Sequence, residues 1–132
     1  MARKHLAVFL RGFAKKILEE EKTVELRFSQ NQILPYKAIT KDDIIFLKNS
    51  GGKIIGKVTV DNVLYYQNLS KGQIFKIKQE YGQAACMDDN FWAKKINSRF
   101  VSIILLKNPV KFLAPLLFKK HDRRPWVILE DE

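Results

Sequence analysis

Residues 5–29, HLAVFLRGFAKKILEEEKTVELRFS, decide the fold that we expect for this chain. The apolar run at 5–10 is typical of a buried strand. Apolar residues then recur at intervals of three and four over 10–18, which indicates one face of a helix ending near Glu21. Strict alternation over 23–28 predicts a second strand, with its charged side chains on one face. The segment therefore predicts the order strand, helix, strand.

Downstream of this segment the pattern favours strands. Apolar runs at 44–47 and 54–60 flank the sequence Asn-Ser-Gly-Gly, a strong signal for a hairpin. Pro109 and Pro115 are expected to break up the stretch after a long apolar strand. The other expected elements are strands at 63–66, 100–106 and 126–129 and short helices that begin after Ser70 and Asp88. This order predicts one α+β domain over residues 1–132, with a sheet that curls into a small barrel.

The chain is basic, and its charge is unevenly distributed. Among 132 residues there are 24 Lys and Arg against 14 Asp and Glu, a formal net charge of +10. Residues 94–124 contain a single acid, Asp122, among many bases. This footprint favours a polyanion as the partner, with a solvated basic surface as the alternative. Within the segment we expect contacts to RNA phosphates from Lys119, Lys120, Arg123 and Arg124.

Several classes of function lack their sequence signatures. There is no phosphate-loop, dinucleotide-binding or serine-hydrolase motif. The two histidines lie far apart and Cys86 is the single cysteine, so we expect no metal site, no cofactor and no internal disulfide. No apolar run approaches the roughly 18 residues of a membrane span. We therefore expect a cytoplasmic protein without membrane association, with a monomer favoured.

The most informative polar pattern consists of Lys22, Glu25 and Arg27. On a strand after a helix, Glu25 and Arg27 project from one face together with Ser29, and Lys22 lies at the corner. An acid between two bases can shape a polar pocket, act as a general base or accept a hydrogen bond from a substrate amine. A solvent-exposed ion pair is the alternative.

The predicted hairpin turn is a second candidate site. Its glycines, Gly51 and Gly52, allow a ligand to approach the backbone closely, Lys48 supplies positive charge, and Ser50 adds a hydroxyl. A plain hairpin turn is the alternative.

Taken together, these residues resemble the ASCH domains, which belong to the PUA-like superfamily of RNA-binding pseudo-barrels. The family signature is an opening strand, a helix and G-x-K-x-x-E-x-R. Lys22, Glu25 and Arg27 are in register with it, whereas Glu20 replaces the glycine. The run L-K-x-S-G-G-x-I-x-G at 47–56 and the ending R-R-x-W-V-x-L at 123–129 extend the resemblance over nearly the whole chain.

The resemblance implies a PUA-like β-barrel flanked by a few short helices, with a cleft suited to RNA or a nucleotide. Our first hypothesis is a binding module whose ligand contacts Lys22, Glu25, Arg27, Ser29, Lys48, Ser50, Gly51 and Gly52. The alternative is a hydrolase for a modified nucleoside or RNA, in which Lys22 and Glu25 are catalytic. In the ASCH branch that hydrolyses 4-acetylcytidine, a threonine stands where this chain has Glu25. A third hypothesis is a protein-interaction adaptor.

Overall fold

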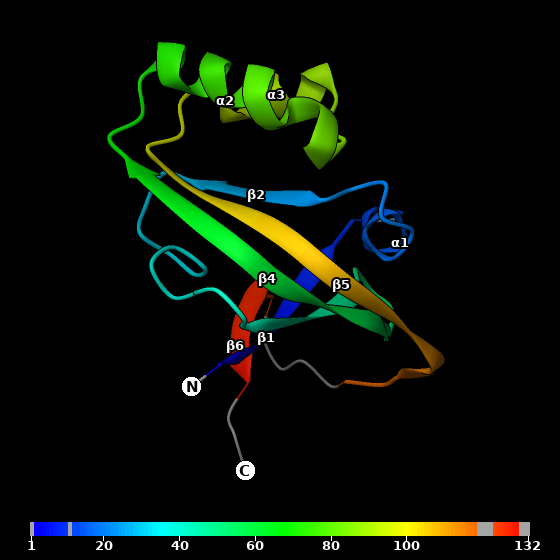
Figure 1. Ribbon diagram of the computed structural model, residues 1–132. Coiled ribbons are helices and arrows are strands. Elements are labelled where there is room, and N and C mark those ends of the chain that lie inside the picture. Colours follow the sequence, from blue (N-terminus) through cyan, green and yellow to red (C-terminus); the bar gives the residue numbers. More distant parts are fainter. Residues whose placement is uncertain (1, 11, 119–122, 130–132) are drawn as a thin grey trace.

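The computed structural model of the chain describes residues 2–10, 12–118 and 123–129. The elements follow in the order β1 (Lys4–Phe9), α1 (Phe13–Leu18), β2 (Val24–Ser29), β3 (Ile44–Asn49), β4 (Ile54–Gln67), α2 (Lys71–Ala85), α3 (Asp89–Lys95), β5 (Phe100–Leu116) and β6 (Trp126–Leu129). The strands form one six-stranded sheet in the order β2-β5-β4-β3-β1-β6, which curls on itself (Figure 1). The predicted α+β fold, a curled sheet with a few short helices, is confirmed.

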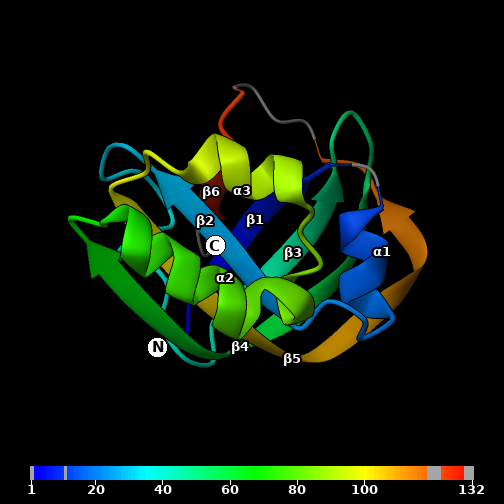
Figure 2. The same cartoon turned by 90° about the horizontal axis from the view of Figure 1, so that it is seen from above.

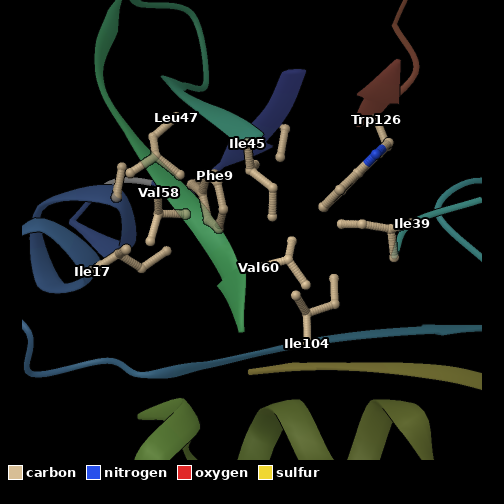
Figure 3. Close-up of a cluster of buried hydrophobic side chains, with 11 residues drawn as sticks. Phe9, Ile17, Ile39, Ile45, Leu47, Val58, Val60, Ile104 and Trp126 are labelled. Carbon is tan, nitrogen blue, oxygen red and sulfur yellow. The ribbon is translucent and has the colours of Figure 1, made fainter. Parts of the chain in front are cut away.

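The inner side of the curled sheet holds the first of two apolar cores (Figure 3). Alternate residues of β1, β3 and β4 point into it, as the two-residue period of a strand requires. Helix α1 packs against β3, β4 and β5 and adds Ala14 and Ile17. The core residues are Ala7, Phe9, Ala14, Ile17, Ile39, Ile45, Leu47, Val58, Val60, Ile104 and Trp126.

The second core lies on the other side of β2 and β5, under α2 and α3 (Figures 1 and 2). Val24 and Leu26 of β2 point into it together with Ile103 of β5. The neighbouring residue Ile104 points the opposite way, into the first core. Strand β2 is therefore buried on both faces, and the face that carries Glu25 is the inner side of the curled sheet.

The starts of α2 and α3 confirm the predicted helix signals. The Ser70 hydroxyl accepts a hydrogen bond from the backbone N–H of Gln73, whose side chain in turn accepts one from the Ser70 N–H, a complete capping box. The Asp88 carboxylate caps α3 by accepting from the N–H of Phe91. These helix starts can be predicted from the sequence because each capping interaction joins residues only three positions apart.

Helix α1 is shorter than the pattern predicts. It begins after Gly12, whose φ of 93° lies in the left-handed region that favours glycine. It ends at Leu18, and Glu20 also has a positive φ, of 61°. Leu10, which the helical spacing placed on the apolar face, lies outside the helix and is 71% exposed.

Strand β5 contradicts the prediction that Pro109 and Pro115 break up this stretch. It runs through both prolines to Leu116, and its pairing with β4 shifts register at each of them. A proline without an N–H fits such an irregularity because no ladder hydrogen bond is required there. The two strands approach each other closely at Gly56 of β4, where a Cβ would lie 2.5 Å from the carbonyl oxygen of Val110 on β5.

Candidate functional site

Lys22, Glu25 and Arg27 form a buried ionic network on the inner side of the sheet. Glu25 is opposite Ile104 on β5, so its carboxylate points inward. Its Oε1 lies 3.1 Å from Nζ of Lys22, and its Oε2 accepts a hydrogen bond of 2.8 Å from Nε of Arg27. Lys22 also donates to the carbonyl of Ala85, at the end of α2. The network therefore joins β2 to the last turn of α2.

Arg27 is the member of this network that reaches open space. Its side chain is 18% exposed, against 0% for Lys22 and 5% for Glu25. Its Cζ lies 5.0 Å from the ring centroid of Phe9 and 5.1 Å from that of Trp126, and a terminal nitrogen donates to a backbone carbonyl of β1. These contacts fix the plane of the guanidinium group.

Glu25 is held in its ionised form. Burial by itself raises the pKa of Glu25, but the charges of Arg27 and Lys22 and their hydrogen bonds outweigh it and leave the pKa below its ordinary value. A carboxylate with a lowered pKa is a weak proton acceptor. The arrangement therefore suits Glu25 to orient its two cationic neighbours better than to remove a proton.

A cavity of about 310 Å³, which we call the inner cavity, opens beside this network. Glu25, Arg27 and Ser29 supply polar atoms to its wall. The rest of the wall is largely apolar, with Phe13 and Phe91 among its aromatic members. Such a mixture of apolar wall and few polar groups is typical of a small-ligand site.

A second hollow, of about 540 Å³, adjoins the inner cavity, because both are lined by Val8, Leu10, Arg27 and Pro125. We call it the basic hollow. Its other lining residues come from the end of β3, the β3–β4 turn and the segment before β6, and they are Lys48, Ser50, Gly51, Arg123 and Arg124. Among the described residues that line it there is no Asp or Glu. The sign of its charge favours an anion.

The structure distributes the candidate residues over these two spaces. Glu25, Arg27 and Ser29 line the inner cavity, while Lys48, Ser50, Gly51, Arg123 and Arg124 line the basic hollow. Lys22 and Gly52 line neither, and Lys22 is 1% exposed. Lys119 and Lys120 lie outside the described residues. Turn, strand and tail residues that are far apart in the sequence thus meet around Arg27.

Sequence reasoning missed Lys95 as a site residue. It lies on α3, lines the inner cavity, and places its Nζ 5.4 Å from the ring centroid of Phe91. Burial, and then the charges of Arg27 and Lys94, lower the pKa of Lys95. Its spacing of four residues from Phe91 puts both side chains on one helix face, and this was the available signal.

A second buried network on the inner side of the sheet contains His5, Asp43 and Trp126. The indole N–H of Trp126 donates to Nδ1 of His5 over 3.0 Å, and Nε2 of His5 lies 2.8 Å from Oδ2 of Asp43. Because an indole nitrogen only donates, Nδ1 must be the acceptor and Nε2 carries the proton. Among the described residues no group of three or more His, Cys, Asp or Glu is placed to hold a metal ion.

Comparison with solved structures identifies the fold. The crystal structure of ASCH from Zymomonas mobilis superposes with a TM-score of 0.75 over 97% of this chain and 88% of that chain, at 15% sequence identity. Two single-residue variants of that protein give TM-scores of 0.76 and 0.75, at 14% and 15% identity, and cover 89% and 91% of their chains. No family model matches the sequence, and no curated protein matches it. Over the described residues, no helix has the length and apolar character to cross a membrane. The chain has the ASCH fold, a PUA-like pseudo-barrel.

Proposed function

We propose that this chain binds nucleic acid, and that RNA or a nucleotide occupies the inner cavity and the basic hollow together. The observation that carries the proposal is the continuity of the two spaces around Arg27. A mostly apolar space beside a cationic one matches the two halves of a nucleotide, a flat base and a charged phosphate. The ASCH fold is compatible with a nucleic-acid-binding module in general.

In this proposal the base enters the inner cavity and the phosphate lies in the basic hollow. Phe13 and Phe91 offer aromatic surfaces for stacking, which is the usual way of holding an unpaired base. Arg27, whose plane is fixed by Phe9 and Trp126, presents its edge to acceptor atoms of the ligand. The side chains of the basic hollow neutralise the phosphate.

The hydrolase alternative rests on a different observation, the 3.1 Å pair between Lys22 and Glu25. It has weaker support, because Lys22 is buried away from both spaces and is bound to Ala85 and Glu25. The lowered pKa of Glu25 also makes this carboxylate a poor base. A nucleoside-hydrolysing reaction would require its substrate to reach the far side of this network.

A matched pair of lysines on α3 tests the binding proposal. Lys95 lines the inner cavity, whereas its neighbour Lys94 is exposed and does not. We expect Lys95→Gln to weaken binding of a single-stranded RNA oligonucleotide about fivefold, the effect of about 1 kcal/mol, and Lys94→Gln to leave it nearly unchanged. Fluorescence anisotropy at several salt concentrations measures both affinity and its salt dependence.

The same samples separate the two functions. Mass spectrometry of the RNA, and of a panel of modified nucleosides after incubation, should return every input mass unchanged if the protein only binds. A new mass that disappears in Lys22→Ala would favour the hydrolase. Equal loss of affinity in Lys94→Gln and Lys95→Gln would mean that general surface charge, not the inner cavity, is responsible for binding.

A further inference from the structure

A third hollow, of about 440 Å³, lies where the connection from β4 to α2 meets the connection from α3 to β5. The two connections run side by side (Figure 1), and the backbone N–H of Leu69 joins them by donating to the carbonyl of Arg99 over 3.1 Å. We call this space the α2 hollow, because residues 68–71, at the start of α2, form half of its wall and residues 96–99 form the other half.

The α2 hollow lies at the start of α2, where backbone N–H groups are free. Helix α2 has 15 residues, and its capping box satisfies the N–H groups of Ser70 and Gln73. The N–H groups of Lys71 and Gly72 have no partner within the described part of the chain. Lys71 lines the α2 hollow, and Gly72 is the next residue of the helix. Unpaired N–H groups at a helix start attract anions.

An unpartnered hydroxyl on the opposite wall points independently to a ligand. Ser98 is only 7% exposed and lines the α2 hollow. Its Oγ makes no hydrogen bond to any residue that the structure describes and is not fully enclosed by protein, so it is available to a ligand in the hollow. The backbone holds it in place, since the Ser98 N–H donates to the carbonyl of Lys95 over 2.9 Å.

The charge of the α2 hollow is also positive. Lys71 and Arg99 line it from its two walls, and the described part of the chain contributes no Asp or Glu to its lining. Free N–H groups, an unused hydroxyl and two cations make a donor set that matches the oxygens of a phosphate group.

The α2 hollow also neighbours the inner cavity. The backbone N–H of Arg99 donates to the carbonyl of Ser29 over 3.0 Å, and Ser29 lines the inner cavity. Lys95 of the inner cavity directly precedes Ile96 of the α2 hollow. The two spaces have no lining residue in common, but the connection from α3 to β5 links them.

We propose that the α2 hollow binds a backbone phosphate of the RNA strand whose nucleotide occupies the inner cavity. The site extends the contact surface from one nucleotide to a longer single strand. This inference rests on the proposed function for the source of the phosphate, but the affinity of the α2 hollow for phosphate itself does not depend on it.

Titration with inorganic phosphate, followed by NMR of the backbone amides, tests the site alone. The amide signals of Lys71 and Gly72 should shift with a saturable dependence on phosphate. Arg99→Gln should weaken this binding roughly tenfold, the loss expected for one charge-assisted hydrogen bond, and Ser98→Ala should weaken it less. Lys76→Gln is the matched control, because Lys76 is exposed on the same helix and lies outside the α2 hollow. Unmoved Lys71 and Gly72 signals, or equal effects of Arg99→Gln and Lys76→Gln, would overturn the inference.

A second measurement uses oligonucleotides of increasing length. Arg99→Gln should weaken binding of a long single strand and reduce its salt slope by about 0.7, while mononucleotide binding stays unchanged. Lys95→Gln should weaken binding of both the long strand and the mononucleotide. If no RNA binds at all but phosphate still shifts the two amides, the proposed function fails and the phosphate site stands. If RNA binds and Arg99→Gln has no effect at any length, the inference fails and the proposed function stands.

Discussion

The two buried polar networks inside the sheet differ in what they face. The first network consists of Lys22, Glu25 and Arg27, and its last two members line the inner cavity. His5 of β1 is bonded to Asp43, just before β3, and to Trp126 of β6, and none of the three lines the inner cavity or the basic hollow. The networks touch, because the Trp126 ring lies beneath Arg27 while its N–H donates to His5.

This comparison shows that burial of polar groups does not by itself mark a functional site. His5 and Asp43 are as deeply buried as Lys22 and Glu25, since each whole residue is exposed to 4% or less. Hydrogen bonding accounts for the closed network, since Asp43 accepts from His5 and from the backbone N–H groups of Arg3 and Thr40. The access of Arg27 to open space is what distinguishes the other network.

Glu25→Leu is expected to have the largest effect on stability. It leaves Lys22, whose side chain is 0% exposed, without its carboxylate partner. Removal of one member of a buried ion pair costs about 3–5 kcal/mol. Urea unfolding should show this loss, and the double substitution of Lys22→Met with Glu25→Leu should recover part of it. A loss below about 1 kcal/mol would mean that water already reaches the Lys22 amine.

Asp43→Asn should destabilise the protein by about 1–3 kcal/mol, because a buried acceptor loses its charge while its donors remain. In contrast to changes at the inner cavity, it should leave the affinity for RNA unchanged. Urea unfolding and anisotropy on the same samples measure the two effects. If RNA binding is weakened under conditions in which the variant is fully folded, the network of His5 and Asp43 is not purely structural.

The pH dependence of stability should involve both networks. Burial by itself raises the pKa of Asp43, but hydrogen bonds from Arg3, His5 and Thr40 lower it below its ordinary value of 3.8, and the pKa of Glu25 is likewise below 4.5. A carboxyl whose pKa is lower in the folded state stabilises the fold above its unfolded pKa, and this contribution is lost as pH falls through the folded pKa.

The urea midpoint should therefore decline as pH falls below about 4.5, and these carboxyls should add no slope between pH 6 and 8. Glu25→Gln and Asp43→Asn should each flatten the acid decline. An unchanged decline in both variants would assign it to other carboxyl groups.

Lys95→Gln should have the smallest effect on stability, within about 0.5 kcal/mol, while it weakens RNA binding. Burial and the nearby charge of Arg27 already disfavour the Lys95 ammonium, as its lowered pKa shows, so its loss removes little that stabilises the fold. Thermal unfolding beside the binding assay separates the two effects. A marked loss of stability would make Lys95 a structural residue.

Local signals explain which elements the sequence predicted. The capping box of Ser70 and Gln73 and the alternation along β2 depend on residues a few positions apart. Predictions from these signals therefore do not require knowledge of the tertiary structure. Pro109 was misjudged because its effect depends on the partner strand, where a register shift and Gly56 accommodate it. Leu10 was misjudged for a different reason, since helical spacing alone does not reveal that the helix starts after Gly12.

The sequence by itself determined the order of strands and helices, the polar pattern Lys22–Glu25–Arg27 and the basic character of the chain. Only the tertiary structure decided that β2 is covered on both faces, so that Lys22 is buried while Arg27 reaches the inner cavity. It also brought Lys95 of α3 and Arg123, before β6, to the same region as Arg27. The physical reason is that curling of the sheet brings distant segments together, and no local preference of the chain encodes the distance between them.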